Sequence, residues 1–303
     1  MKTIGFKSLA TVLLVAAFGS SALAQGSGTL DKIKSTGGMT IGHRDASIPF
    51  SYLDDKQQPL GFSLDLCAKI VNAIKAELKM PTLKVSYQPV TGATRIPLLA
   101  NGTIDLECGS TTNNADRQKQ IAYTYTSFVT ANRFISKKVD NLKTLTDLKG
   151  KNVVATAGTT NLRQLTELNA AQNLGINILT AKEHAESFLM VDTGRAVAFV
   201  MDDVLIAGMV ANHPKPGQWQ MSTDSLSVEP YAIMLRKDDA AFKKVADNAM
   251  ASMMKNGEYQ AIYTKWFMNP IPPKGINLNI PMSESLKKVV ANPTDSPDPA
   301  VYK

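Results

Sequence analysis

Residues Asp147–Thr160 have the sequence DLKGKNVVATAGTT, which predicts the end of one helix, a strand and the start of the next helix. The helix predicted over 142–148 ends at Gly150, because glycine readily adopts the left-handed conformation that closes helices. The apolar run Val153–Ala155 then predicts a short strand, and the Gly-Thr-Thr sequence from Gly158 predicts the start of another helix. This order of elements is typical of an α/β protein.

The same alternation continues on both sides of this segment. Ser63 is the predicted N-cap of the first long helix. Strands are predicted at 39–42, 50–53, 60–62, 83–87, 104–108, 176–179, 196–200 and 231–235. Helices are predicted at 63–78, 95–100, 184–191, 240–255 and 259–267, with others beginning near 160 and 203, and the tail after 270 is predicted to wrap the surface.

The length of the chain predicts two lobes, because the chain has more residues than usually pack around a single hydrophobic core. No Pro/Gly-rich linker separates the two halves, so we expect extended crossover strands near 127–129 and 228–231 to join the lobes as a hinge. This arrangement gives a discontinuous first lobe of 25–128 and 230–303, and a second lobe of 129–229.

The first 24 residues are typical of a secretory signal peptide. Lys2 and Lys7 precede the uncharged apolar run Leu9–Phe18, and the small residues Ala22 and Ala24 form a cleavage site. The apolar run is shorter than the roughly 20 residues that a membrane-spanning helix needs. We therefore expect a periplasmic protein that is not inserted in the membrane and, without a cysteine at the cleavage site, carries no lipid anchor.

Charge and cysteine content exclude several classes of protein. Loss of the predicted signal peptide lowers the formal net charge from +7 to about +5, and the lysines are scattered, so no nucleic-acid-binding surface is predicted. In an oxidising compartment, Cys67 and Cys108 favour a disulfide over a zinc site, which would need four ligands. Three dispersed histidines predict neither a metal site nor a cofactor.

The segment Gly109–Arg117 (GSTTNNADR) carries polar groups suited to a carboxylate. Ser110 and Thr112 supply hydroxyl groups after a predicted strand, and Arg117 follows shortly afterwards. Backbone N–H groups at such a turn, joined by a guanidinium, match the hydrogen bonds that a carboxylate accepts. The alternative is an ordinary polar loop whose arginine faces water.

Thr159 and Thr160 lie at the start of a predicted helix, where unpaired N–H groups and the helix dipole favour an anion. Thr160 could equally be an ordinary N-cap. Asp202 emerges at the carboxyl end of an apolar strand, where α/β proteins bind ligands. Asp203 is the expected helix cap, which leaves Asp202 as the candidate partner for a ligand ammonium. Pairing of Asp202 with a nearby Lys or Arg is the alternative.

Arg44 and Arg95 are two more cations at the ends of predicted elements. His184 begins a predicted helix, and on sequence alone it is typical of a surface histidine.

Six segments together resemble the bacterial extracellular solute-binding proteins for amino acids, and among them the glutamate/aspartate-binding proteins of ABC importers. They are spread over nearly the whole chain after the signal peptide: IGHRDASIPFSY at Ile41–Tyr52, GFSLDL at Gly61–Leu66, NGTIDLECGSTTNNADRQKQ at Asn101–Gln120, DLKGKNVVATAGTT at Asp147–Thr160, GRAVAFVMDD at Gly194–Asp203 and KWFMNPIPPK at Lys265–Lys274.

The resemblance implies a two-lobe periplasmic-binding-protein fold of type II, with a ligand cleft at a two-strand hinge. It implies L-glutamate or L-aspartate as ligand, the membrane permease of an ABC importer as partner, and no enzymatic activity. A monomer is the default expectation. The residues implied to bind the α-carboxylate are Arg117, Ser110 and Thr112. Asp202 is implied to bind the α-ammonium, Thr159 and Thr160 to contribute from the second lobe, and Arg44, Arg95 and His184 to neutralise the side-chain carboxylate.

Because glutamate carries two carboxylates and one ammonium, we expect the fixed positive groups of the cleft to outnumber its single negative group. The chain departs from the family pattern at Gly92, where relatives often place a serine three residues before the arginine at 95. This departure bears on the choice between glutamate and aspartate.

Two other functions stay open. A periplasmic dehydratase on the same fold would need a general acid or base, for which Glu107 and His184 are the candidates. The ligand-binding module of an amino-acid sensor would ordinarily accompany a membrane helix or a signalling domain, and the sequence predicts neither.

Overall fold

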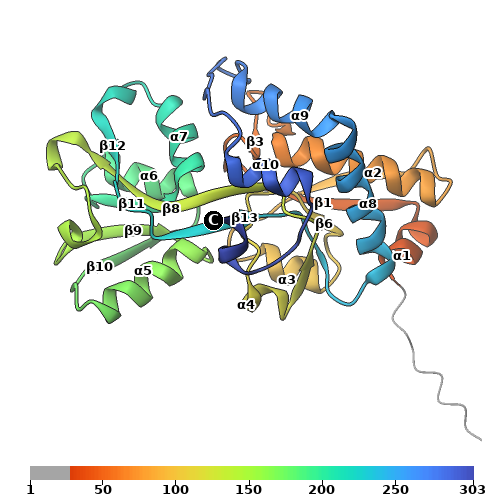
Figure 1. The fold of residues 1–303 in the computed structure, drawn as a ribbon, viewed down its shortest axis with the longest axis horizontal. Coiled ribbons are helices and arrows are strands. Elements are labelled where there is room, and N and C mark those ends of the chain that lie inside the picture. The colour runs from red at the N-terminus through yellow and green to blue at the C-terminus, as the bar shows by residue number, and fades with distance from the viewer. Residues whose placement is uncertain (1–27) are drawn as a thin grey trace, which may run out of the picture.

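The computed structural model describes residues 28–303, so the predicted signal peptide lies outside the described residues. Within this range two β-sheets define two lobes, which lie side by side in Figure 1. The first-lobe sheet has the order β5-β1-β6-β14-β7, formed by Lys84–Pro89, Gly38–His43, Leu106–Glu107, Met234–Arg236 and Ile121–Tyr123. The second-lobe sheet has the order β10-β9-β11-β8-β12, formed by Asn177–Ala181, Asn152–Thr156, Ala198–Asp202, Phe128–Lys137 and Trp219–Met221.

Three short strands form a separate small sheet in the first lobe: β2 (Ala46–Ser47), β3 (Ser51–Leu53) and β4 (Pro59–Leu60). In the large sheets, β1 pairs in parallel with β5 and β6, and β9 pairs in parallel with β10 and β11. Parallel neighbours need crossover connections, which the helices supply. The α/β class predicted from the sequence is therefore confirmed.

The lobes are joined by β8 and by β13 (Ser227–Tyr231), which pair antiparallel with Phe128 opposite Tyr231. This pair lies where the crossover strands were predicted. The prediction of one strand over 231–235 is wrong, because the chain leaves β13 at Tyr231 and enters β14 of the other sheet at Met234. The exact boundaries between the lobes stay a prediction.

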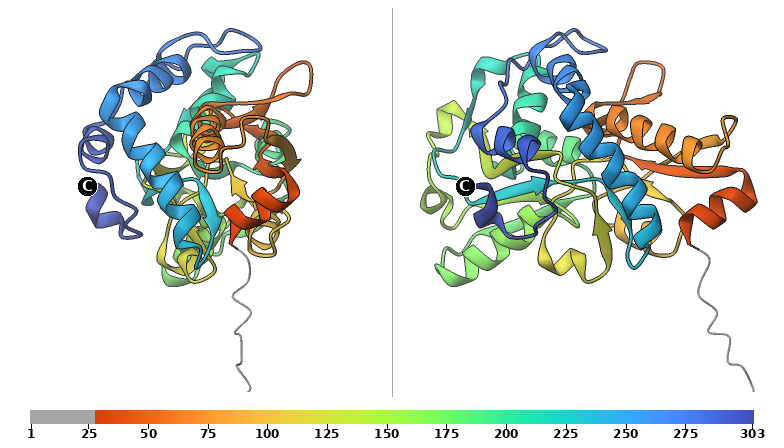
Figure 2. Two further views of the ribbon diagram at one scale, coloured as in Figure 1. Left: turned by 90° about the vertical axis from the view of Figure 1, so that its right-hand side faces the viewer. Right: turned by 45° about the vertical axis from the view of Figure 1, so that its right-hand side comes forward.

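Helices cover both sheets (Figures 1 and 2). Their bounds are Thr29–Thr36 for α1, Phe62–Glu77 for α2, Arg95–Ala100 for α3, Ala115–Gln118 for α4, Thr160–Ala171 for α5, His184–Asp192 for α6, Asp203–Ala211 for α7, Ala240–Asn256 for α8, Glu258–Tyr263 for α9 and Glu284–Ala291 for α10. None of these helices within 28–303 is long and apolar enough to span a bilayer.

The start of α2 explains why the sequence has glycine at Gly61. This residue has a φ of 142°, and a Cβ added to it would lie 2.2 Å from the carbonyl oxygen of Phe50. Gly61 occupies the N-cap position, and Ser63 lies inside the helix with its hydroxyl donating to the carbonyl of Gly109. The prediction that Ser63 caps the helix is therefore wrong.

A disulfide joins α2 to the residue that follows β6. Cys67 and Cys108 are both fully buried, and their Cα atoms are 6.3 Å apart. The predicted disulfide is confirmed, and it fixes the long helix against the sheet edge from which Gly109–Arg117 departs.

Three predicted stretches differ from the structure. The region 142–148 forms only a 3₁₀ turn at Leu145–Leu148. A capping box between Thr144 and Asp147 lies at its N-terminal end. The helix predicted over 259–267 consists of α9 and a π-helical turn at Thr264–Met268. The tail contains α10, which packs on α8 and β8, because Leu286 and Val289 give it one buried side.

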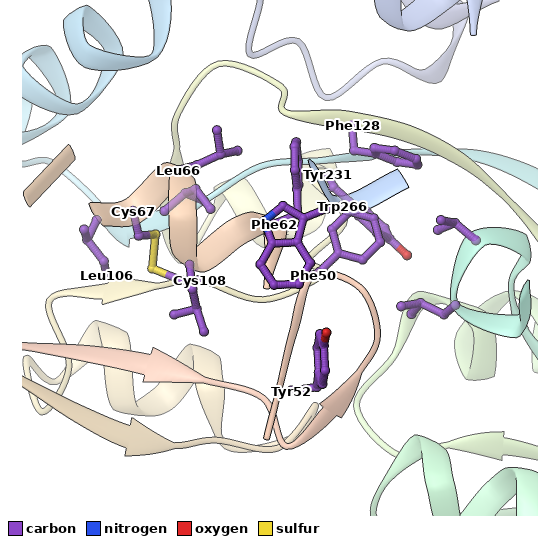
Figure 3. Close-up of a cluster of buried hydrophobic side chains, with 14 of the residues drawn as sticks. Phe50, Tyr52, Phe62, Leu66, Cys67, Leu106, Cys108, Phe128, Tyr231 and Trp266 are labelled. Atoms are coloured by element: carbon purple, nitrogen blue, oxygen red, sulfur yellow. A yellow bond between two sulfur atoms is a disulfide. The ribbon is translucent and has the colours of Figure 1, made fainter. Parts of the chain in front are cut away.

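Aromatic rings fill the space beside the hinge strands (Figure 3). Phe50 meets Phe128 and Tyr231 edge-on, with ring centroids 5.0 and 5.2 Å apart. Phe62 and Phe267 complete the cluster, at 5.9 and 5.6 Å from Phe50. The core of the first lobe thereby extends to both strands that lead into the second lobe.

Candidate functional site

A small cavity lies between the two lobes. It is lined by Arg95, Ser110, Thr112, Thr159, Thr160, Asn161, His184, Met201 and Asp202. Seven of the nine residues predicted to bind the ligand are in this lining; Arg44 and Arg117 are not. Asn161 and Met201 were missed, although both directly neighbour predicted residues in the sequence.

A larger groove runs along α7, β8 and α10. Its lining within the described residues is mostly apolar, and Asp203 is the single charged side chain there. The smaller cavity is the better candidate, because specific binding of a polar molecule needs converging polar groups.

Arg95, at the start of α3, is buried in the first-lobe wall. It donates to the hydroxyl of Thr111, and its Nη1 lies 3.8 Å from Oε1 of Glu107. Burial lowers the pKa of Arg95 to about 10, against the opposing effect of Glu107. The guanidinium is therefore still protonated at neutral pH.

Arg44, which follows β1, is completely buried. Its Nη2 lies 2.6 Å from Oε2 of Glu183, the residue that precedes α6 in the other lobe. Within residues 28–303, Nε and Nη1 of Arg44 have no hydrogen-bond partner, and neither do Nε of Arg95 and the hydroxyl of Ser110. Of these residues, Arg95 and Ser110 line the cavity, so the first-lobe wall holds buried donors that can serve an anion.

Arg117 lies in α4, where the side chain of Asn114 caps the helix by accepting from the N–H of Arg117. Its Nη1 donates to the carbonyl of Thr112 at 2.9 Å, and its Nη2 to the carbonyl of Gly158 in the second lobe at 3.2 Å. The side chain is buried, so the alternative of a water-facing arginine is wrong.

The start of α5 supplies hydroxyl groups from the second lobe. Thr159 is the N-cap, because its hydroxyl accepts from the N–H of Leu162 and donates to the carbonyl of Thr156. The hydroxyl of Thr160 is therefore free of capping; it donates to Glu229 at 3.1 Å and lies 3.4 Å from the hydroxyl of Thr112.

His184 is 2% exposed, so its interpretation as a surface histidine is wrong. Its Nδ1 lies 2.9 Å from the hydroxyl of Thr156. Burial, together with the guanidinium groups of Arg44 and Arg95, lowers the pKa of His184 well below its ordinary value. His184 therefore faces the cavity as a neutral ring that can form a hydrogen bond but adds no charge.

Asp202 is the last residue of β11 and is 2% exposed. Its carboxylate accepts from Nδ2 of Asn161 at 2.8 Å and from the hydroxyl of Tyr231. Burial, and next the neighbouring Glu229, raise the pKa of Asp202 to about 7. None of the ion pairs formed within the described residues includes Asp202, so its predicted alternative, pairing with a Lys or Arg, is wrong there.

Asp203 was expected to cap α7, and this is wrong. Asp202 occupies the cap position without using its side chain, and Asp203 is the first helical residue. The carboxylate of Asp203 accepts instead from the hydroxyl of Thr130 and the N–H of Ala131 on β8.

The expected surplus of positive groups is also wrong. Glu183 lies beside Arg44 and Glu107 beside Arg95, so two of the three arginines already have a carboxylate nearby. Glu183 could have been suspected from its capping-box spacing with Glu186, which the structure shows. Glu107 is buried behind Thr111, which donates to it at 2.7 Å. The cavity is therefore characterised by hydrogen-bond donors on the first-lobe wall and an acid on the second-lobe wall, rather than by a surplus of positive charge.

This arrangement can hold a small molecule that has an acidic end and a positively charged end. Buried donors face the acidic end, and Asp202 offers a carboxylate to the positive end. No group of three or more His, Cys, Asp or Glu side chains in the part of the chain that the structure describes is placed to hold a metal ion.

Two known proteins are similar to this chain over most of its length. The L-glutamate/L-aspartate-binding protein of Pseudomonas aeruginosa is 54% identical over 289 residues, which are 95% of this chain and 96% of that protein. The glutamate/aspartate import solute-binding protein of Escherichia coli K12 is 46% identical over 267 residues, 88% of each chain.

Among solved structures, an ancestral amino acid-binding protein, described as a precursor of cyclohexadienyl dehydratase, superimposes with a TM-score of 0.66 at 30% identity, covering 78% of this chain and 99% of that one. The family model of the bacterial extracellular solute-binding proteins, family 3, matches residues 39–269. With this match, the chain belongs to family 3 of the bacterial extracellular solute-binding proteins.

Proposed function

We propose that this protein captures L-glutamate or L-aspartate between its lobes and delivers it to the membrane permease of an ABC importer. The observation that carries the proposal is the composition of the cavity, in which buried donors of Arg95 and Ser110 face Asp202 across the lobes. An acidic amino acid has the complementary groups. The names of the Pseudomonas and Escherichia relatives support the same ligands.

The proposed roles are those that the family resemblance implies; seven of the nine residues line the cavity, whereas Arg44 and Arg117 lie outside its lining. Arg117, Ser110 and Thr112 bind the α-carboxylate, and Asp202 binds the α-ammonium. Thr159 and Thr160 add contacts from the second lobe. Arg44 and Arg95 bind the side-chain carboxylate through their unpaired nitrogens, and His184 adds a hydrogen bond as a neutral ring. Because partners come from both lobes, the ligand is fully paired only when the lobes close.

We also propose that residues 1–24 are a signal peptide and that the mature chain works in the periplasm as a monomer without a lipid anchor. Its first lobe comprises 25–128 and 230–303, and its second lobe 129–229.

The protein is proposed to catalyse no reaction. A dehydratase is the alternative, because the name of the ancestral protein mentions a dehydratase and His184 lines the cavity. Glu107, the other candidate, is absent from the lining and is held by Thr111 and Arg95. Incubation with cyclic and acyclic acids, followed by mass spectrometry, is expected to return every compound unchanged, and a dehydrated product would contradict this assignment.

The ligand is tested by thermal shift against the twenty amino acids, followed by calorimetry. We expect only glutamate and aspartate to raise the melting temperature strongly. Arg117→Ala should cost roughly 3–5 kcal/mol of glutamate affinity, because it leaves a buried carboxylate without its partner. Arg195→Ala, at an exposed arginine outside the cavity, is the matched control. A neutral or basic preferred ligand, or normal glutamate binding by Arg117→Ala, would contradict the proposal.

A further inference from the structure

Two glycine backbones touch beside the cavity. Gly92 lies in the turn between β5 and α3 of the first lobe, and Gly158 in the turn between β9 and α5 of the second. A Cβ added to Gly92 would lie 2.6 Å from the carbonyl oxygen of Ala157, and one added to Gly158 would lie 2.5 Å from the carbonyl carbon of Gly92. Real Cβ atoms essentially never approach this closely, so either side chain would force the two backbones apart.

The contact belongs to a set of interactions between the lobes. Arg117 of the first lobe donates to the carbonyl of Gly158, and Arg163 of α5 pairs with Asp116 of α4. Thr159 directly follows Gly158, and Arg95 comes three residues after Gly92. Both residues line the cavity. The separation of the two turns therefore governs how near the two walls of the cavity come to each other.

The two glycines are not equivalent. Gly158 has a φ of +73°, so it needs glycine for its own backbone whatever the other lobe does. Gly92 has no such requirement, since its φ lies outside the left-handed region. A relative with serine at this position must hold the two turns farther apart, so the close backbone contact is specific to chains with glycine there. The obstruction to a side chain at Gly92 comes from the backbone of the opposite lobe, which cannot swing aside as a flexible side chain would.

A second contact of this kind involves Gly208, inside α7 of the second lobe. A Cβ there would lie 2.6 Å from the carbonyl oxygen of Ile48, between β2 and β3 of the first lobe. Glycine inside a helix is unfavourable relative to alanine. The helix itself therefore gives no reason for Gly208, whereas the approach of the first lobe does.

We propose that Gly92 and Gly208 are positioning residues that set how far the lobes close, because their missing side chains allow backbone of one lobe to touch backbone of the other. This inference rests on the proposed function, in which closure brings the donors of both lobes onto one amino acid. A side chain at either position leaves the open protein intact and penalises the closed one.

The test compares Gly92→Ala, the larger Gly92→Val and Gly208→Ala with wild type. Gly38→Ala in the first lobe and Gly217→Ala in the second are matched controls, since an added Cβ meets only ordinary contact at Gly38 and open space at Gly217. Calorimetry and stopped-flow measurements use the amino acid that wild type binds best, X-ray scattering measures the liganded radius of gyration, and calorimetric melting measures the ligand-free protein.

We expect Kd to rise by about tenfold to a hundredfold in Gly92→Ala and Gly208→Ala, and further in Gly92→Val, as overpacking predicts. Most of the change should be faster dissociation, with a larger radius of gyration in the liganded state than wild type shows. The ligand-free melting temperature should stay unchanged in Gly92→Ala and rise in Gly208→Ala, because alanine favours the helix.

Wild-type affinity in these variants, or a fall in their ligand-free melting temperature, would overturn the inference. A wild-type protein that prefers a different amino acid would reject only the proposed ligand, since the variants are compared with that amino acid. A wild type that binds no amino acid would overturn both.

Discussion

Asp202 is the single residue on which the chemistry of the cavity depends most. It is a buried acid without a basic partner in the described part of the chain, held by Asn161 and Tyr231 and close to Glu229. Its pKa rises from an ordinary value of 3.8 to about 7, chiefly through burial. Folding therefore takes up a proton between these two values, and Asp202 destabilises the ligand-free protein progressively as the pH rises from about 4 to about 7.

Asp202→Asn tests this effect. At pH 8 the variant removes a buried charge, so the ligand-free protein should gain stability, on the order of 2–4 kcal/mol. At pH 4.5 wild-type Asp202 is protonated, and the two proteins should have nearly the same stability. Urea denaturation at both pH values measures the difference. Asp203→Asn, at a partly exposed neighbouring acid, is the control. A lower stability of Asp202→Asn at pH 8 would show that the carboxylate has a structural role.

At the scale of elements, short-range sequence patterns predicted most helices. Which residue caps a helix depended instead on tertiary contacts. Helix α2 has the predicted period, with Leu66, Ile70 and Ile74 buried. Its N-cap position must be a glycine, Gly61, because the Phe50 carbonyl leaves no room for a side chain there. Its attachment to the sheet comes from the disulfide between Cys67 and Cys108, which closes a loop with a sequence separation of 41.

Removing this disulfide should lower stability without abolishing ligand binding. Loop closure of this size predicts a loss of about 4 kcal/mol. Neither cysteine lines the cavity, so the variant Cys67→Ala/Cys108→Ala should bind glutamate with near-normal affinity at temperatures where it is folded. Chemical denaturation with and without a reductant measures the loss in wild type, and the double variant should not respond to the reductant. Equal stability of both proteins would contradict the expected contribution.

At the scale of the whole molecule, the two sheets meet through β8 and β13, and the aromatic cluster fixes that connection. Figure 3 shows Phe50 and Phe62 beside Phe128 and Tyr231 of the hinge strands. Residues from distant parts of the sequence thus share one buried region at the base of the hinge. This packed base connects the two lobes that form the walls of the cavity.

Phe50→Ala should destabilise the ligand-free protein by about 3–5 kcal/mol, because a fully buried ring in contact with four others leaves a cavity behind. Tyr87→Ala, at a ring that is 50% exposed, should change stability by less than about 0.5 kcal/mol. Thermal and urea unfolding measure both variants. A loss at Phe50 no larger than that at Tyr87 would mean that the cluster does not stabilise the base of the hinge.

The sequence by itself determined the α/β class, most elements, the disulfide and seven of the residues that line the cavity. These follow from periodicity, turn residues and resemblance, which involve neighbours a few positions apart or whole motifs. The split of 231–235 between two sheets left no local trace, because both pieces are apolar and extended.

Only the tertiary structure decided the electrostatics of the site. Arg44 and Glu183 are 139 positions apart, and no local pattern relates them. The burial of His184 and the contact of Asp202 with Tyr231 likewise depend on residues that are distant in the sequence. Burial and charge pairing depend on which groups surround a residue in space, and that arrangement exists only in the folded chain.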